Sequence, residues 1–188
     1  MIHIRTFIGI DFSKECKEFI SELQQRFRKY SVRGRWKRIE NFHLTLKFLG
    51  EISTERKNQI DMAMSSICSA FRPFSLEIAK AGIFKGHDKI RVLWLGVGGE
   101  LDALHRLAGS IDSSMSSLGF PPENRRYTPH ITIGQDIVFE CPFENIAESI
   151  GEISYGPIKV EKINLFKSEQ IRNRRVYTIV SEYDLEGV

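Results

Sequence analysis

Two short segments of the chain share one pattern, His43-Leu44-Thr45-Leu46 and His130-Ile131-Thr132-Ile133. Side chains on an extended strand alternate between its two faces, so in each segment the histidine and the threonine share one face while the aliphatic residues point into a core. One such segment alone is an ordinary half-buried strand, because threonine favours strands. The chain has only five histidines, however, and a second copy by chance is rare. The pair therefore predicts one site with two imidazoles and two hydroxyls.

Length and composition predict one compact domain. The 188 residues suffice for a substantial core, and contents of 41% hydrophobic and 27% charged residues are typical of soluble proteins. No apolar run reaches membrane-spanning length, and the alternation over residues 1–11 differs from the continuous apolar stretch of a signal peptide. We therefore expect a cytoplasmic monomer without a membrane partner. Cys16, Cys68 and Cys141 are odd in number and widely spaced, which argues against a disulfide framework or a zinc site.

The spacing of apolar residues predicts an α+β chain of alternating strands and helices. Helices are expected where apolar residues recur every three or four positions after a capping serine or a Gly-Gly break. The basic segment 31–39 and the segment 119–129 are expected to be loops. Expected strands cover 2–10, 42–49, 74–79, 91–97, a start at 130, 158–166 and 175–180; expected helices cover 14–30, 53–70 and 100–118; further loops are expected at 82–89 and 167–174.

The two motif strands occupy similar places in this order, because each follows a helix and a basic loop. This repetition indicates a worn duplication. It predicts two pseudo-symmetric lobes, each with an antiparallel sheet and helices, that face each other across a central cleft with one motif per lobe. No low-complexity linker separates the halves. We therefore expect residues 1–188 to form a single domain made of two intertwined lobes.

Basic residues gather beside both motifs, although the formal net charge is only +3. A run without acidic residues leads into the first motif, and Arg125 and Arg126 lead into the second. Such a run is often only a solvated face, but its position here favours an anionic substrate. Trp36 and Tyr127 offer flat surfaces nearby on which a base could stack. The run consists of Arg26, Arg28, Lys29, Arg33, Arg35, Lys37 and Arg38, and Arg172, Arg174 and Arg175 lie near the C-terminus.

A pair of histidines with two hydroxyls suits acid–base chemistry on a phosphate, because near neutral pH one imidazole can be neutral while the other is charged. Metal-dependent hydrolysis is the alternative chemistry, but each strand offers one good ligand and no carboxylate at ligand spacing. The sequence has no Gly-x-Ser-x-Gly turn for a nucleophile and no P-loop signature. The alternative from another class is a non-catalytic module that binds RNA or a nucleotide in the same cleft, although such a module would not need both histidines. His3, His87 and His105 are expected to have surface roles, and Tyr177 and Trp94 are expected in the core.

The residues around both motifs resemble the signatures of the two-histidine (2H) phosphoesterase superfamily. Within it they look most like the RNA 2′,3′-cyclic phosphodiesterase family, also called 2′-5′ RNA ligases. Residues Trp36 to Glu51 resemble the first signature, and Arg125 to Ile133 resemble the second. The resemblance spans nearly the whole chain. Its further matches are residues 5–11, residues 91–97, residues 165–168 and Tyr177.

This resemblance implies a bilobal α+β fold with a central cleft. It also implies hydrolysis of an RNA or nucleoside 2′,3′-cyclic phosphate to a 2′-phosphate, with reversible 2′-5′ RNA ligation as a further reaction. The expected partner is RNA with a cyclic phosphate end, or a small cyclic nucleotide. The two histidines are expected to act without a metal ion or a cofactor. We assign His43 as the proton donor and His130 as the proton acceptor.

By position, Thr45 and Thr132 are expected to hold the phosphate through hydrogen bonds to its non-bridging oxygens. The chain departs from the family pattern at one position, because Gln135 stands where the family often carries an arginine. A neutral amide brings no charge to a phosphate, so a ligand contact at that site is not carried over. The further expected substrate contacts are Arg125, Trp36 and Tyr127.

Overall fold

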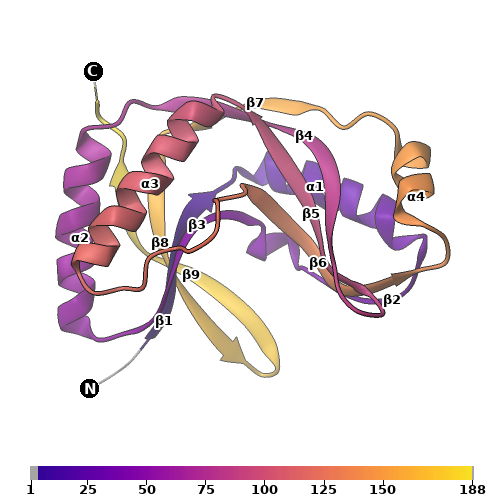
Figure 1. Ribbon diagram of the computed structural model, residues 1–188, viewed down its shortest axis with the longest axis horizontal. Coiled ribbons are helices and arrows are strands. Elements are labelled where there is room, and N and C mark those ends of the chain that lie inside the picture. Colours follow the sequence, from indigo (N-terminus) through magenta and orange to yellow (C-terminus); the bar gives the residue numbers. More distant parts are fainter. Residues whose placement is uncertain (1–3, 188) are drawn as a thin grey trace.

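The computed structural model describes residues 4–187, and over this range the chain forms two antiparallel sheets and four α-helices (Figure 1). The predicted α+β class is therefore confirmed, while His3 lies outside the described residues. The strands are β1 (Ile4–Asp11), β2 (Ser31–Trp36), β3 (His43–Ile52), β4 (Phe74–Lys85), β5 (Ile90–Gly99), β6 (His130–Phe139), β7 (Tyr155–Val160), β8 (Lys162–Ile171) and β9 (Arg174–Asp184). The helices are α1 (Lys14–Arg28), α2 (Thr54–Ser69), α3 (Leu101–Ser117) and α4 (Phe143–Ile150), with a short 3-10 helix, η1 (Ile39–Asn41).

Each sheet carries one of the two motifs. The first sheet has the strand order β3-β1-β8-β9, so it joins the beginning of the chain to its end. The second sheet has the order β2-β6-β5-β4-β7. His43 is the first residue of β3, and His130 is the first residue of β6. Because β3 and β6 also contact each other, the two sheets meet at their motif strands.

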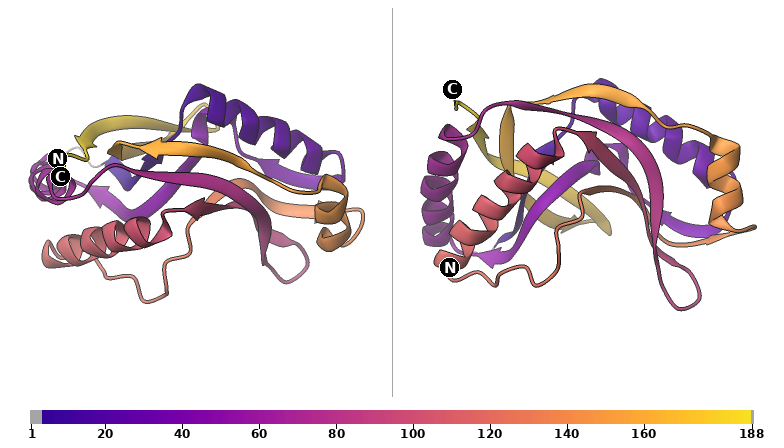
Figure 2. Two further views of the ribbon diagram at one scale, coloured as in Figure 1. Left: turned by 90° about the horizontal axis from the view of Figure 1, so that it is seen from above. Right: turned by 45° about the horizontal axis from the view of Figure 1, so that its top comes forward.

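Helices α1 and α3 each follow a strand of one sheet but pack on the other sheet. Helix α1 follows β1 of the first sheet but contacts β6 and β7 of the second. Helix α3 follows β5 of the second sheet but contacts β3 of the first, and α2 contacts both α3 and β9. Figure 2 shows α2 and α3 together at one end of the molecule, with α4 at the other. Helices α1 and α3 therefore each connect one sheet to the other.

Helix α1 forms because its sequence offers a capping residue and a single apolar face. The side-chain oxygen of Ser13 accepts a hydrogen bond from the backbone N–H of Cys16 at 3.2 Å. A cap of this kind is worth about 1 kcal/mol. Cys16, Ile20, Leu23 and Phe27 are buried at helical spacing, and this apolar face packs into the core. The prediction of a helix after Ser13 is confirmed.

The structure contradicts the predicted loop over 31–39, because residues Ser31–Trp36 form strand β2. This strand is at the edge of the second sheet and is mostly exposed, so no alternation of apolar residues marks it.

The predicted single strand 158–166 is also wrong. It is two strands, β7 and β8, which belong to different sheets and are separated only by Glu161. Apolar residues continue on both sides of that position, so the pattern hides the break.

Helix α4 was not predicted, because it has only eight residues and no capping side-chain hydrogen bond. The two predicted loops at 82–89 and 167–174 are tighter than expected. Strand β4 extends to Lys85, and β8 and β9 extend to a turn formed by Arg172 and Asn173. The second of these hairpins lies close to the first motif, as the geometry of the site shows.

Candidate active site

The first histidine is held by the backbone that precedes it. The Nδ1 atom of His43 lies 2.8 Å from the carbonyl oxygen of Asn41. A carbonyl can only accept a hydrogen bond, so Nδ1 carries the proton and Nε2 is left as the nitrogen that titrates. The Nε2 atom lies 3.0 Å from the hydroxyl oxygen of Thr45. The alternation of β3 therefore brings the histidine and the threonine of the motif into direct contact.

The second histidine is held in the same way. The Nδ1 atom of His130 lies 2.7 Å from the carbonyl oxygen of Thr128, again two residues upstream. Its Nε2 atom has no hydrogen-bond partner among residues 4–187, and neither has the hydroxyl of Thr132 in that range. Both imidazoles are thus fixed through Nδ1 and present Nε2 for chemistry. A backbone carbonyl can come from any residue type, so no residue of the sequence could have revealed this arrangement.

Aromatic rings enclose His43. Its ring centroid lies 4.6 Å from that of Phe7, 5.1 Å from that of Tyr177 and 5.8 Å from that of Phe166. Burial lowers the pKa of His43 to about 4, because desolvation penalises the imidazolium more than the hydrogen bond to Asn41 favours it. The free site therefore holds a neutral His43 at pH 7. Tyr177 was expected in the core, and the structure places it against this histidine instead.

His130 also has aromatic neighbours. Phe84 meets its ring edge-on at 5.1 Å, and the centroid of Trp94 lies 6.4 Å away. Trp94 pairs with Thr132 across β5 and β6, so the indole stands beside the second motif, and it is only half-buried. Its indole N–H is shielded from solvent and has no hydrogen-bond partner among the described residues. The expectation that Trp94 is only a core residue is therefore incomplete.

One cavity joins the two motifs. Thr45 of the first sheet and His130 of the second both line a cavity of about 220 Å³. Arg125 also lines it, and so does Phe48, which is 67% exposed. Tyr127 is a further lining residue, and its hydroxyl donates a hydrogen bond to the carbonyl oxygen of Thr45 at 2.9 Å. Tyr127 thus ties the segment before His130 to the first motif.

Trp36 and Tyr127, the residues expected to stack on a base, are only partly exposed. Trp36 is half-buried and packs on Gly134, where an added Cβ would lie 3.2 Å from the indole. Tyr127 is half-buried, and burial raises the pKa of its hydroxyl. Gln135 faces Arg35 across β2 and β6. This places an arginine opposite the position at which the family pattern has one.

The basic run before the first motif does not act as one patch. Arg26 donates a hydrogen bond to the carbonyl oxygen of Ile150, Arg35 is paired with Asp136, and Arg38 is paired with Glu40. Lys37 is the member of the run that reaches the site. It is half-buried, its backbone N–H donates to the carbonyl of Ile133 at 3.0 Å, and its charge contributes to the lowered pKa of His43. Burial in turn lowers the pKa of Lys37, together with the charges of Arg35 and Arg175.

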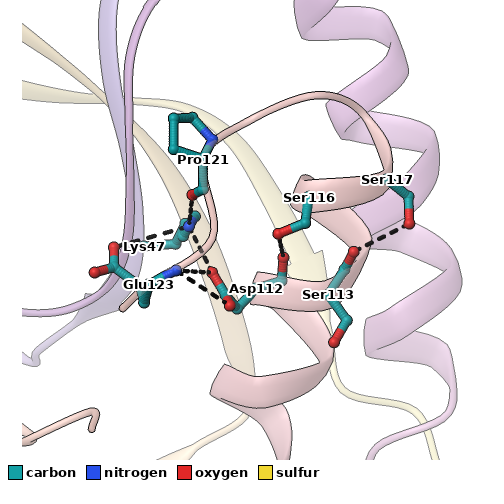
Figure 3. Close-up of polar contacts among 7 residues, drawn as sticks. All are labelled: Lys47, Asp112, Ser113, Ser116, Ser117, Pro121 and Glu123. Atoms are coloured by element: carbon teal, nitrogen blue, oxygen red, sulfur yellow. Dashed lines mark hydrogen bonds and ion pairs between the residues drawn. The ribbon is translucent and has the colours of Figure 1, made fainter. Parts of the chain in front are cut away.

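A buried lysine anchors the loop that carries Arg125 and Tyr127. The Nζ atom of Lys47, whose side chain is only 1% exposed, lies 2.5 Å from Oδ1 of Asp112 in α3 and 2.6 Å from the carbonyl oxygen of Pro121 (Figure 3). The same Asp112 oxygen accepts a hydrogen bond from the backbone N–H of Glu123 at 3.1 Å. A register shift between β1 and β3 just before Lys47 accompanies its contact with the helix. This group of contacts, the Lys47 clamp, joins β3, α3 and the loop.

Among residues 4–187, no three His, Cys, Asp or Glu side chains are grouped so that they could hold a metal ion. No helix in that range is long and apolar enough to cross a membrane.

Comparisons with known proteins point to one family. The family model for LigT-like phosphoesterases matches residues 10–94 and 96–177. An RNA 2′,3′-cyclic phosphodiesterase of Thermotoga maritima is 32% identical over 98% of this chain and 97% of its own. The RNA 2′,3′-cyclic phosphodiesterase of Escherichia coli K12 is 33% identical over 96% of both chains. The crystal structure of Escherichia coli LigT complexed with 3′-AMP superposes with a TM-score of 0.81, at 28% identity, over 98% of this chain and 99% of that one.

Proposed function

The chain belongs to the LigT-like phosphoesterase family and is a cyclic phosphodiesterase, and we propose that His43 and His130 carry the proton transfers of its reaction on RNA 2′,3′-cyclic phosphates. One observation carries the proposal. Two imidazoles from different sheets are each fixed by an Nδ1 hydrogen bond to a carbonyl, and the Thr45 hydroxyl beside one of them lines the same cavity as the other. This arrangement supports two imidazoles that act on one bound phosphate.

The reaction opens the ring of the cyclic phosphate. Nε2 of His130 accepts a proton from water while the water oxygen forms a bond to phosphorus. The P–O3′ bond breaks, and Nε2 of His43 delivers a proton to the leaving O3′, so that a 2′-phosphate and a free 3′-hydroxyl result. The hydroxyls of Thr45 and Thr132 donate hydrogen bonds to the non-bridging oxygens, where negative charge grows. Lys37 adds a positive charge beside His43.

The environment of His43 makes binding and protonation interdependent. Its pKa of about 4 means that the imidazole must take up a proton to act as the donor at neutral pH. A bound phosphate monoanion favours this uptake, because an opposite charge close to an imidazole raises its pKa. The expected result is a substrate complex in which His43 is protonated, although the free enzyme is not.

The assignment of donor and acceptor is tested by the pH dependence of single variants. In the His130→Ala enzyme, His43 is the remaining proton-transferring imidazole. If His43 is the donor, the residual kcat/KM is expected to fall about tenfold per pH unit as the pH rises above about 4, because kcat/KM reports the free enzyme. A residual kcat/KM that instead rises with pH through that value and then stays level would exchange the two roles. The measurement needs single-turnover rates between pH 3.5 and 8.

The activity is expected to be independent of metal ions, since two histidines provide both proton transfers. Turnover of adenosine 2′,3′-cyclic phosphate should be unchanged after dialysis against EDTA. Loss of turnover, restored by a divalent ion, would contradict this expectation. The comparison should include an enzyme sample dialysed without EDTA, so that loss from dialysis itself is recognised.

The overall proposal is tested by product analysis. Purified protein is incubated with adenosine 2′,3′-cyclic phosphate, and the 2′- and 3′-phosphates are separated by chromatography. Formation of the 2′-phosphate alone is expected. Tight binding without turnover would instead favour the alternative, a non-catalytic module that binds RNA or a nucleotide. Reversible 2′-5′ ligation, and action as a cytoplasmic monomer, stay predictions.

A further inference from the structure

A second cavity, of about 460 Å³, lies between η1 and the β8–β9 hairpin. Its volume is in the range of small-molecule sites. We refer to it as the hairpin pocket. Neither histidine lines it, but two of its lining residues contact the first histidine. The carbonyl of Asn41 accepts the Nδ1 hydrogen bond of His43, and the ring of Tyr177 stands edge-on to the imidazole. The side-chain amide of Asn41 also donates to the carbonyl of Arg175 at 2.8 Å, which fastens the hairpin to the motif.

Positive charge is concentrated in the hairpin pocket. Four arginines line it, and the single acidic lining residue, Glu40, is already paired with Arg38 at 3.0 Å. Among residues 4–187, the guanidinium groups of Arg172 and Arg174 have neither an ion pair nor a hydrogen bond. Exposed guanidinium groups without protein partners, close to the proposed phosphate site, suit the recognition of a further phosphate.

The turn of the hairpin holds an arginine in an unfavourable conformation. Arg172 has φ of 45° and Asn173 has φ of 62°. A two-residue hairpin turn of this kind favours asparagine, aspartate or glycine at both positions. A left-handed backbone costs a residue with an ordinary side chain about 1 kcal/mol. Arg172 therefore lowers the stability of the turn, and its guanidinium group lines the pocket.

Apolar surface lies among these cations. Ile171 is 48% exposed, and Val176 and Tyr177 line the same pocket. Flat or apolar surface next to a guanidinium group matches a nucleotide, which joins a base and a ribose to a charged phosphate. A lone phosphate would need only the cations.

We propose that the hairpin pocket binds the penultimate nucleotide of an RNA whose terminal cyclic phosphate lies between the two histidines. This inference rests on the proposed function. A 2′,3′-cyclic phosphate closes the 3′ end of an RNA, so the chain continues only on its 5′ side, and the next charged group is an internucleotide phosphate. Arg172 and Arg174 bind that phosphate, and Ile171 and Tyr177 contact the base and the ribose. The enzyme therefore prefers RNA ends over mononucleotides.

The test compares two substrates in two double variants. The double variant Arg172→Asn/Arg174→Gln removes both free guanidinium groups, and asparagine fits the turn without loss of stability. Its control, Arg72→Gln/Arg106→Gln, removes the same charge from exposed positions outside the pocket. The ratio of kcat/KM for a dinucleotide cyclic phosphate to that for adenosine 2′,3′-cyclic phosphate is measured for each. We expect this ratio to fall about tenfold in the first variant, which corresponds to one charge-assisted hydrogen bond, and to stay at the wild-type value in the control.

Binding provides a readout that does not need turnover. The affinity for a fluorescent trinucleotide that ends in a 2′-phosphate is measured by anisotropy over a range of salt concentrations. In the first variant, the slope of log K against log salt is expected to decrease by about 0.7, which is the effect of one lost phosphate contact. An unchanged slope together with an unchanged ratio would overturn the hairpin pocket as a nucleotide subsite. If the wild type turns over neither substrate, the proposed function fails, and the binding slopes alone decide the inference.

Discussion

Replacing His43 with glutamine, or His130 with alanine, is expected to lower kcat on a 2′,3′-cyclic phosphate by about 10² to 10⁴-fold, the range typical of a lost general acid or base. Glutamine is chosen for His43 because its side chain fills part of the space among Phe7, Phe166 and Tyr177. Alanine suffices at His130, because its hydrogen bond to the carbonyl of Thr128 is exposed and water can replace it. Initial rates with adenosine 2′,3′-cyclic phosphate measure both effects.

The control for these variants is His87→Ala. His87 is exposed in the turn between β4 and β5, and its replacement is expected to leave kcat unchanged. Near-normal turnover in either site variant would rule out the two-histidine mechanism. A double variant that lacks both imidazoles should be little slower than the slower single variant, because groups that act in one step do not contribute independently.

The second large effect concerns the Lys47 clamp. Asp112→Ala is expected to lower the free energy of unfolding by about 3 kcal/mol, because it leaves the ammonium of Lys47 buried without its nearest carboxylate. Glu123, at 3.8 Å and 54% exposed, replaces this partner poorly. The backbone N–H of Glu123 also loses its acceptor, so the loop that carries Arg125 should be released as well. Urea unfolding gives the change in stability, and KM reports the loop.

Two variants show whether the clamp or a general loss of charge is responsible. The pair Lys47→Met/Asp112→Asn removes both charges and keeps the volume, so it is expected to cost much less than Asp112→Ala. Glu18→Gln removes an exposed ion pair with Lys14 in α1, where a change below about 0.5 kcal/mol is expected. Equal losses of stability in Asp112→Ala and Glu18→Gln would contradict a structural role for the clamp.

The parts of the fold that were predicted from the sequence are those with a strong local signal. Apolar residues at helical spacing after Ser13 predicted α1, and the alternation around His43 and His130 predicted both motif strands. The site follows from them, because a strand presents residues two apart on one face. Strand β2 escaped prediction because an exposed edge strand needs no apolar pattern.

The surroundings of the histidines could not be predicted, because they depend on pairing between distant strands. Phe7, Phe166 and Tyr177 come from β1, β8 and β9, and nothing in the local sequence of any of them points to His43. The low pKa of His43 arises from this enclosure and was equally inaccessible. The hairpin pocket has the same origin, since Arg38 and Arg174 meet only when the end of the chain folds back beside η1.

The position of β1 between β3 and β8 also sets the order in which the surroundings of His43 assemble during synthesis. A ribosome releases the N-terminal strands first, so His43 emerges long before Phe166 and Tyr177 exist to enclose it. Until then, one edge of β1 has no partner strand, and the first imidazole stays in water. A nascent chain therefore carries both His-x-Thr motifs before the rings that enclose the first of them are in place. The enclosure that lowers the pKa of His43 is therefore complete only after β8 and β9 have been made and paired.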